Sequence, residues 1–214
     1  MEVDALYPDM QERAEAYPRL LGEQVSQDTI EDPAGLQNLA RSLLVKNDRP
    51  CYVEEDDRAF TSLENLVDLY LEYGAVPTYP FMGNPVTEEE EDLDLLLKRV
   101  QEKRLHALDM IDYRTHLDRA REIVQAAEAH QLPLFVGTEH NTKTMMPLVG
   151  PVENALELRD YFEKSARFVL GHQLLSRLCG FGAVDEEGAP RIQDNGERFT
   201  FFREAGRVEL SDEL

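Results

Sequence analysis

The middle of the chain, residues 61–141, alternates between two spacings of apolar residues. Stretches in which apolar residues recur every three or four positions predict amphipathic helices, and the short apolar runs between them predict buried strands. The expected strands cover residues 75–79, 105–111 and 132–136, and the expected helices begin at capping sequences that open with Thr61, Thr87 and Thr115. Because helices and strands alternate, the strands should run parallel and be joined by right-handed crossovers.

Two further segments flank this region. Residues 1–50 are predicted to form a helical N-terminal segment, with one helix capped by Asp32, and Cys51–Val53 is predicted as a short strand. Residues 51–150 would then form the α/β core, and residues 151–214 a helical C-terminal extension with a charged tail. The expected fold class is therefore α/β, a partial (half) β/α barrel of parallel strands with additional N- and C-terminal helices.

The net charge of the chain argues against some classes of binding partner. With 22 basic and 43 acidic residues the formal net charge is −21, and no long basic stretch interrupts the acidic excess. Such a surface repels the phosphates of nucleic acids and of anionic membranes, so we expect neither as a direct partner. No run approaches the roughly 18 apolar residues of a membrane span, the acidic N-terminus lacks a secretory signal, and the two cysteines form no CxxC pair. These features favour a cytoplasmic location.

The densest group of polar residues follows the third expected strand. The apolar run stops at Gly137, and Thr138-Glu-His-Asn-Thr-Lys143 comes directly after it. In parallel α/β sheets, sites lie at the carboxyl ends of the strands. Glu139 and His140 could ligate a divalent metal such as Zn, Mn or Fe, or act as an acid–base pair. The alternative is a polar loop that faces solvent.

The second expected strand ends between two aspartates. Asp109 and Asp112, three positions apart, should point to opposite faces of the sheet. Asp109 lies inside the apolar run, where an unpaired charge is costly, so it is the candidate for a functional role, and Asp112 is interpreted as a loop cap. Arg114 could bind a phosphate or a carboxylate, with a surface ion pair as the other interpretation. His172, in an apolar helical run, is typical of a core histidine with satisfied hydrogen bonds.

The order of these elements resembles that of a known family, the polymerase-and-histidinol-phosphatase (PHP) superfamily. The likeness is to the C-terminal half of that family and covers about residues 61–146. It rests on alternating helices and strands and on three short motifs: Tyr79-Pro80, Gly83-Asn84-Pro85 and Gly137-Thr-Glu-His-Asn141. Members of the family are distorted seven-stranded β/α barrels, and the characterised ones are metal-dependent phosphoesterases with a cluster of two or three metals.

The sequence departs from the family pattern at its ligand positions. Tyr79 stands where the family has a ligating histidine, Glu139 where it has aspartate, and Asn141 where it has histidine. The opening His-x-His motif of the family does not occur in the chain, which offers three or four of the seven strands. The chain would therefore be either the C-terminal portion of a longer protein or a relative that kept the scaffold and lost the metal cluster.

The resemblance implies a metal-dependent phosphoesterase that acts on a small phosphorylated molecule. Glu139 and His140 would hold a divalent metal, and Asp109, together with His140, would serve in acid–base catalysis. The other candidates would bind oxygens of the substrate: Tyr79, Arg114, Asn141 and Lys143.

Two alternatives stay open. One is a catalytically inactive PHP-like binding or assembly subunit, which the missing histidines favour. The other is a metal-dependent sugar-isomerase-like barrel fragment that uses Glu139, His140 and Asp109. An isolated half-barrel would expose strand edges and an apolar face. The chain is therefore expected to form a homo-oligomer, or to pair with a partner that supplies the N-terminal half of the barrel, unless its own N-terminal helices cover the gap.

Overall fold

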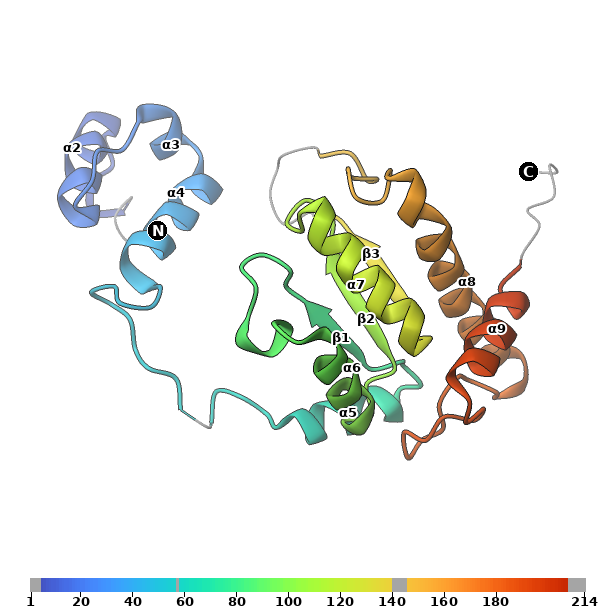
Figure 1. The fold of residues 1–214 in the computed structure, drawn as a ribbon. Coiled ribbons are helices and arrows are strands. Elements are labelled where there is room, and N and C mark those ends of the chain that lie inside the picture. Colours follow the sequence, from blue (N-terminus) through green and yellow to red (C-terminus); the bar gives the residue numbers. More distant parts are fainter. Residues whose placement is uncertain (1–4, 57, 140–145, 208–214) are drawn as a thin grey trace. The chain divides into compact units, whose positions relative to one another are not determined.

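The computed structural model describes residues 5–56, 58–139 and 146–207 (Figure 1). The chain divides into two compact units, Met1–Phe60 and Thr61–Leu214. Each unit has its own hydrophobic core. Within the described ranges, no helix is both long enough and apolar enough to cross a bilayer.

The first unit is a small group of helices. Asp32 caps one of them by accepting the amide of Ala34, with Pro33 in the first turn, which confirms the helix start predicted there. The elements are α2 (Met10–Leu21), α3 (Gln27–Glu31), α4 (Pro33–Ala40) and a π-helical turn η1 (Arg41–Val45). Four buried side chains form the core of this unit: Tyr17, Leu21, Ile30 and Leu36.

The short strand predicted at Cys51–Val53 is wrong. The Cys51 amide donates to the carbonyl of Leu44 at 2.8 Å, and the Tyr52 amide donates to that of Arg49 at 3.0 Å, so these groups close a turn. The apolar side chain of Val53 suggested a buried strand, but it is 78% exposed. The pattern failed because no core lies beneath the segment.

The second unit is a mixed α/β structure built on three parallel strands (Figure 1). The strands β1 (Thr78–Phe81), β2 (Ala107–Ile111) and β3 (Leu134–Gly137) lie in the order β1-β2-β3. The helices are α5 (Leu63–Glu72), the 3-10 turn η2 (Glu88–Glu90), α6 (Leu93–Glu102), α7 (Leu117–His130), α8 (Leu156–Cys179) and α9 (Asn195–Ala205). The predicted alternation of helices with parallel strands is thus confirmed.

All three strands begin later in the chain than the apolar pattern predicted, and for the same reason. Each preceding helix ends at a residue with left-handed backbone: Gly74 (φ 68), Arg104 (φ 59) and Gln131 (φ 55). The next amide then donates to the carbonyl five positions back in the helix: Ala75 to Tyr70 (2.9 Å), Leu105 to Val100 (3.0 Å) and Leu132 to Ala127 (3.0 Å). These helix caps of the Schellman type take up the first apolar residue of every predicted strand.

The helix starts are also displaced from the predicted capping sequences. Ser62, rather than Thr61, caps α5, because its hydroxyl accepts the amide of Asn65 at 3.2 Å. Helix α7 begins after His116, rather than after Thr115, and has no side-chain cap. These shifts of one residue leave the helices where they were expected.

The capping box predicted at Thr87 does not form. Glu90, which would close the box, is fully buried, and its carboxylate accepts the amides of Met82 (2.6 Å) and Gly83 (3.0 Å) in the loop after β1. Thr87 therefore precedes only the turn η2, and α6 begins after Asp92. The contact of Glu90 with the loop after β1 has thus replaced the local capping interaction with Thr87.

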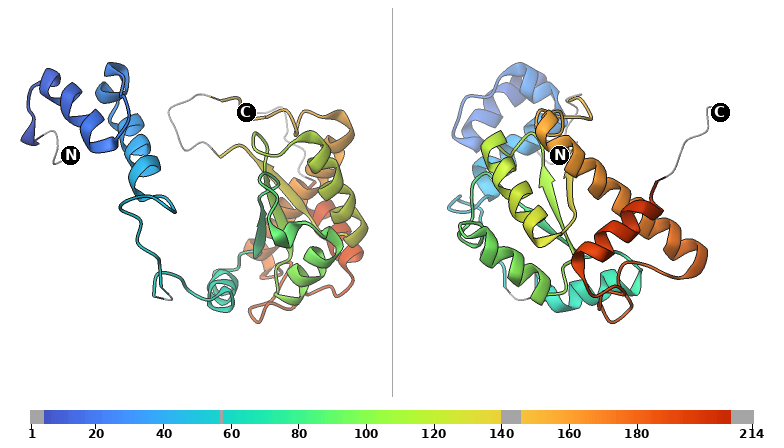
Figure 2. Two further views of the ribbon diagram at one scale, coloured as in Figure 1. Left: turned by 60° about the vertical axis from the view of Figure 1, so that its left-hand side comes forward. Right: turned by 45° about the vertical axis from the view of Figure 1, so that its right-hand side comes forward.

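The two faces of the sheet differ in what covers them. On one face, large apolar side chains are buried under α6 and α7, among them Phe81, Leu108, Met110 and Leu134. On the other face Ala107 is buried, but five residues are partly or fully exposed: Thr78, Pro80, Asp109, Ile111 and Phe135. We call these five residues the open face. Figure 2 shows α6 and α7 gathered on one side of the strands.

The outer edge of β3 is occupied by α8. The hydroxyl of Ser165 accepts the amide of Leu134 at 3.0 Å, and the hydroxyl of Tyr161 donates to the carbonyl of Leu132 at 2.6 Å. Both side chains come from α8. This helix therefore takes the place that a fourth strand would need beside β3.

The outer edge of β1 ends in a proline. The carbonyl of Pro77 accepts the amide of His106 at 2.8 Å, so Pro77 faces β2. Backbone directions alternate along a strand, so Pro80 faces away from β2. Its nitrogen carries no hydrogen and cannot donate to another strand, which makes this edge a poor template for strand addition.

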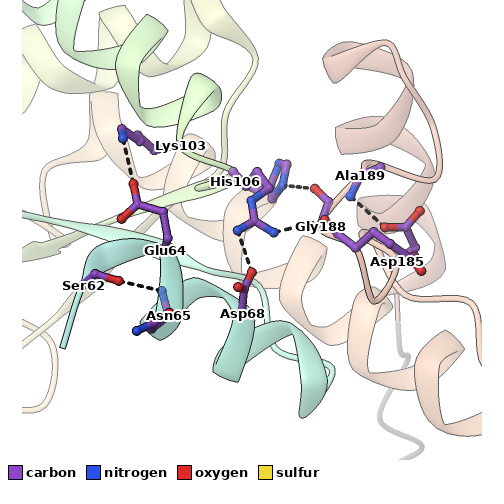
Figure 3. Close-up of polar contacts among 11 residues, drawn as sticks. Ser62, Glu64, Asn65, Asp68, Lys103, His106, Asp185, Gly188 and Ala189 are labelled. Atoms are coloured by element: carbon purple, nitrogen blue, oxygen red, sulfur yellow. Dashed lines mark hydrogen bonds and ion pairs between the residues drawn. The ribbon is translucent and has the colours of Figure 1, made fainter.

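Ion pairs hold α5 beside the turn that leads into β2 (Figure 3). The Lys103 Nζ lies 2.9 Å from the Glu64 carboxylate, and an Arg104 Nη2 lies 2.6 Å from that of Asp68. Both pairs are exposed to solvent, so each contributes little to stability. Their effect is to orient α5 next to the sheet.

Two buried histidines connect loops to the same region. The His106 Nε2 lies 3.0 Å from the carbonyl oxygen of Gly188 (Figure 3). The His172 Nδ1 accepts the amide of Ala183 at 3.0 Å, and its Nε2 lies 3.0 Å from the carbonyl oxygen of Gly74. The prediction that His172 is a core histidine with satisfied hydrogen bonds is confirmed.

Candidate functional site

A cavity of about 640 Å³ lies between α5 and the open face of the sheet. Helix α5 contributes an apolar wall that includes Leu63, Leu66 and Tyr70, and the sheet contributes Asp109 and Phe135. Among the described residues that line it, Asp109 supplies the only ionisable group besides tyrosine hydroxyls. The arrangement is that of a small-molecule site, in which apolar walls surround a few polar groups.

Asp109 occupies the middle strand of this site. Its neighbours in register are Pro80 of β1 and Phe135 of β3, both on the open face. Burial raises the pKa of its carboxyl above the ordinary aspartate value, and the nearby charge of Glu139 raises it further. The sequence-based choice of Asp109 over Asp112 as the functional candidate therefore agrees with an environment that disfavours its negative charge.

Glu139 follows β3 and is exposed. Its backbone has a φ of 45°, a left-handed conformation that is uncommon for a glutamate. Its charge adds to the effect of burial in raising the pKa of the Asp109 carboxyl, but Glu139 does not line the cavity beside α5. The other residues predicted in this loop, His140, Asn141 and Lys143, lie outside the described residues.

Tyr79 borders the cavity, but its side chain belongs to the other face of the sheet. The register pairs it with Leu108, whose side chain is buried under the helices. Burial raises the pKa of its hydroxyl, and the acids Glu90 and Glu89 raise it further. The structure therefore does not place the hydroxyl of Tyr79 beside the carboxyl of Asp109.

Arg114 connects the loops that follow β1 and β2. Its Nε donates to the carbonyl of Asn84 at 2.5 Å, and the Asn84 side chain lies 3.4 Å from the Nε2 of His116. Arg114 is exposed, so it could also meet a ligand at this end of the sheet. Neither Asn84 nor His116 lines the cavity beside α5.

Asp112 is a loop cap, as predicted. It is fully buried, and its two carboxylate oxygens accept the amides of Val152 and Glu153, both at 2.9 Å. The approach of Gly150 is so close that a side-chain carbon there would overlap the carboxylate. Asp112 therefore anchors the chain that returns from β3 to α8.

A second cavity of about 300 Å³ lies on the other side of Phe135, against α8. Its charged lining residues are Glu153, Glu163 and Arg159, so acidic groups again outnumber basic ones. Burial raises the pKa of the Glu153 carboxyl, and the charge of Asp112 adds to the effect. The cavities on the two sides of Phe135 thus both carry carboxylates, Asp109 in one and Glu153 and Glu163 in the other.

The described residues supply too few ligands for a closed metal site. In residues 5–56, 58–139 and 146–207, no three histidine, cysteine, aspartate or glutamate side chains are placed to hold one ion. Asp109 and Glu139 together provide two carboxylates, which suit a divalent cation when further ligands come from elsewhere.

The wall formed by α5 was not recognised in the sequence. The spacing of its apolar residues predicts an amphipathic helix, but only Val67 and Leu71 of α5 are buried, and Leu63 is 42% exposed. The feature of the sequence that could have indicated this wall is the width of the apolar stripe on α5, which contains more residues than pack into the core.

Comparisons of the chain with models of protein families, with curated proteins and with solved structures found no match.

Proposed function

We propose that the second unit is a binding domain that holds a small organic molecule with an apolar body against the open face of its sheet. The observation that carries the proposal is the cavity of about 640 Å³ between α5 and that face. Its volume is typical of small-molecule sites. A carboxyl with a raised pKa in an apolar setting, here that of Asp109, is a common feature of binding and catalytic sites.

The sheet edges favour a binding role over completion of a barrel by a second chain. Added strands would have to displace Ser165 and Tyr161 from β3, or to pair with β1 at Pro80, which cannot donate a hydrogen bond. The tyrosine at position 79, which stands in place of the histidine ligand of the PHP family, also favours a binding role. The domain is then a catalytically inactive PHP-like binding subunit, and the homo-oligomer or N-terminal-half partner stays a prediction.

The test uses a neutral apolar fluorophore, N-phenyl-1-naphthylamine, titrated with the full chain. Leu63 and Leu69 both lie on α5 and are 42% and 48% exposed, but only Leu63 lines the cavity. Leu63→Gln should weaken binding about fivefold, since it removes roughly 1 kcal/mol of apolar contact. Leu69→Gln should leave the affinity unchanged. Absence of binding, or equal weakening by the two substitutions, rejects the proposal.

A second candidate function is a PHP-like metal-dependent phosphoesterase. The observation that favours it is the position of two predicted site residues on neighbouring parallel strands, since Asp109 lies in β2 and Glu139 follows β3. Consecutive parallel strands with α6 and α7 on one face are also the arrangement of part of a β/α barrel, which supports a half-barrel scaffold. A bound Zn, Mn or Fe ion would lower the pKa of a water and polarise a phosphoryl oxygen.

In this candidate function each predicted site residue has a role that follows from its chemistry. Glu139 and His140 would hold the ion, with Asp109 beside them as a base or an orienting group. Four side chains would bind oxygens of a small phosphorylated substrate: Tyr79, Arg114, Asn141 and Lys143.

Metal binding tests this candidate directly. Calorimetry with MnCl₂ and ZnCl₂, after treatment with EDTA, should detect one bound ion in the wild type and none in Glu139→Gln. The matched control is Glu128→Gln, which removes an exposed charge from α7. Hydrolysis of p-nitrophenyl phosphate should follow the same order. No ion on the wild type, or equal hydrolysis by all three proteins, rejects the phosphoesterase.

A further inference from the structure

We infer that the molecule held on the open face is an organic cation, an amine or a guanidinium joined to an apolar body, and that Asp109 receives its positive charge. The inference rests on the proposed binding function and adds the charge of the ligand. Asp109 lies in β2 beside Phe135, Glu139 follows β3, and the apolar wall of α5 stands across the same cavity.

The charges around the open face are predominantly negative. The charged group that acts on Asp109 is another acid, Glu139, and the cavity beyond Phe135 adds Glu153 and Glu163 against a single arginine. Among the described residues, no lysine, arginine or histidine lines the cavity beside α5. A ligand with a positive charge would therefore be electrostatically complementary to this site.

Two basic residues do lie near α5, but each is already paired. Lys103 contacts Glu64 at 2.9 Å, and Arg104 contacts Asp68 at 2.6 Å (Figure 3). The basic groups of this helix–strand turn are thus matched by acids of α5. They leave the charge of Asp109 without compensation from that side.

The apolar wall decides between an organic cation and a bare metal ion. Leu63, Leu66 and Tyr70 offer no ligand that a metal ion prefers, and a bare ion would leave their surface exposed to water. An amine attached to a hydrocarbon or aromatic body can contact both the carboxylate and the apolar wall of the site. Its ammonium makes a charge-assisted hydrogen bond with the carboxylate of Asp109 while its body covers the leucines.

Three ligands that share one apolar body separate the contribution of the ligand's charge from that of its contact with the apolar wall. They are 4-phenylbutylamine, 4-phenylbutan-1-ol and 4-phenylbutanoate, which carry a positive charge, no charge and a negative charge. Each displaces N-phenyl-1-naphthylamine from the full chain at low salt, with EDTA present to remove metal ions. The amine should bind at least about tenfold more tightly than the alcohol, as expected for one charge-assisted contact, and the carboxylate should bind most weakly.

A substitution then assigns the preference to the carboxylate of Asp109. Asp109→Asn should bring the amine down to the affinity of the alcohol and leave the alcohol unchanged. Glu128→Gln, which removes an exposed charge from α7, should keep the full preference for the amine. A preference that survives Asp109→Asn, or one that Glu128→Gln also abolishes, overturns the inference.

The outcomes distinguish this inference from the binding proposal beneath it. If N-phenyl-1-naphthylamine does not bind, or binds equally well to Leu63→Gln, the cavity is not a binding site and both proposals fail. If the alcohol binds there and the amine binds no more tightly, only the inference about charge fails.

Discussion

Ser165 of α8 holds the backbone of Leu134 in β3, because its hydroxyl oxygen accepts the outward-facing amide of the strand at 3.0 Å. The same hydroxyl donates to the carbonyl of Tyr161, also at 3.0 Å, and the Tyr161 hydroxyl donates to Leu132 at 2.6 Å. A helix thus satisfies backbone groups along a strand edge, which in most sheets is the task of another strand. The short sheet is therefore protected on this side without a fourth strand.

Replacing this serine should measure what the contact contributes. Ser165 is fully buried, so Ser165→Ala leaves the Leu134 amide without an acceptor and should cost about 1–3 kcal/mol of unfolding free energy. Urea denaturation followed by circular dichroism gives the value. Thr200→Ala, an exposed change on α9, should stay within about 0.5 kcal/mol of the wild type. Equal midpoints for the two variants would show that α8 does not support β3 in this way.

The three equivalent helix caps offer a matched pair of backbone substitutions. Gly74 and Gln131 have the same role after α5 and α7, with φ of 68° and 55°. Gly74→Ala meets no atom within 4 Å, so it tests the backbone cost alone and should destabilise the protein by roughly 1 kcal/mol. Gln131→Gly should stabilise it by about 0.5–1 kcal/mol. Thermal unfolding midpoints that move in the same direction for both variants would contradict this account of the caps.

The types and order of the elements could be predicted from the sequence because apolar spacing is a local property. The ends of the elements could not, since contacts distant in sequence decide them. Glu90 shows this clearly: its spacing from Thr87 indicates a capping box, but its carboxylate binds the amides of Met82 and Gly83. The left-handed caps at Arg104 and Gln131 were missed for another reason, as neither is the glycine that usually marks such a position.

Part of the candidate site was predictable, and part depended on register. Asp109 could be selected because a carboxyl within an apolar run needs an explanation. The family resemblance grouped Tyr79 with it, but the register pairs Tyr79 with Leu108 and Asp109 with Pro80, which places the two side chains on opposite faces. Register is set by how the strands and helices pack, and a strand's own residues do not specify it when both faces carry apolar groups.

His106 should make the stability of the second unit depend on pH. Burial lowers the pKa of His106 from 6.5 to about 4, and its Nε2 lies 3.0 Å from the Gly188 carbonyl oxygen. Because the folded-state pKa is below the unfolded value, the stabilisation is present above about pH 6.5 and is lost as the pH falls toward 4. Linkage then predicts a loss of roughly 2 kcal/mol between about pH 7 and about pH 5.

Urea unfolding of the wild type and of His106→Gln, at the two pH values, isolates this histidine from the carboxylates that also titrate. The variant should be less stable at neutral pH, since glutamine does not reproduce the ring, but its stability should fall by less on acidification. Parallel losses in the two proteins would assign the pH dependence to other groups.

Asp109 should reduce the stability of the free protein, as a residue kept for binding often does. Burial and the charge of Glu139 raise its pKa, so the folded state favours the protonated carboxyl. Folding therefore keeps a charge there at a cost that is present at neutral and alkaline pH and disappears as the pH falls through the raised pKa. Asp109→Asn removes that cost, so its urea midpoint should exceed the wild-type value at neutral pH, and the difference should shrink in acid.

The same substitution is expected to abolish the preference for an amine, so stability and binding should move in opposite directions at this one position. Glu128→Gln, exposed on α7, serves as the control and should change neither property. If Asp109→Asn instead lowers the midpoint at neutral pH, the carboxylate already has a stabilising cationic partner within the chain. In that case the open face would not need a positive ligand to neutralise it.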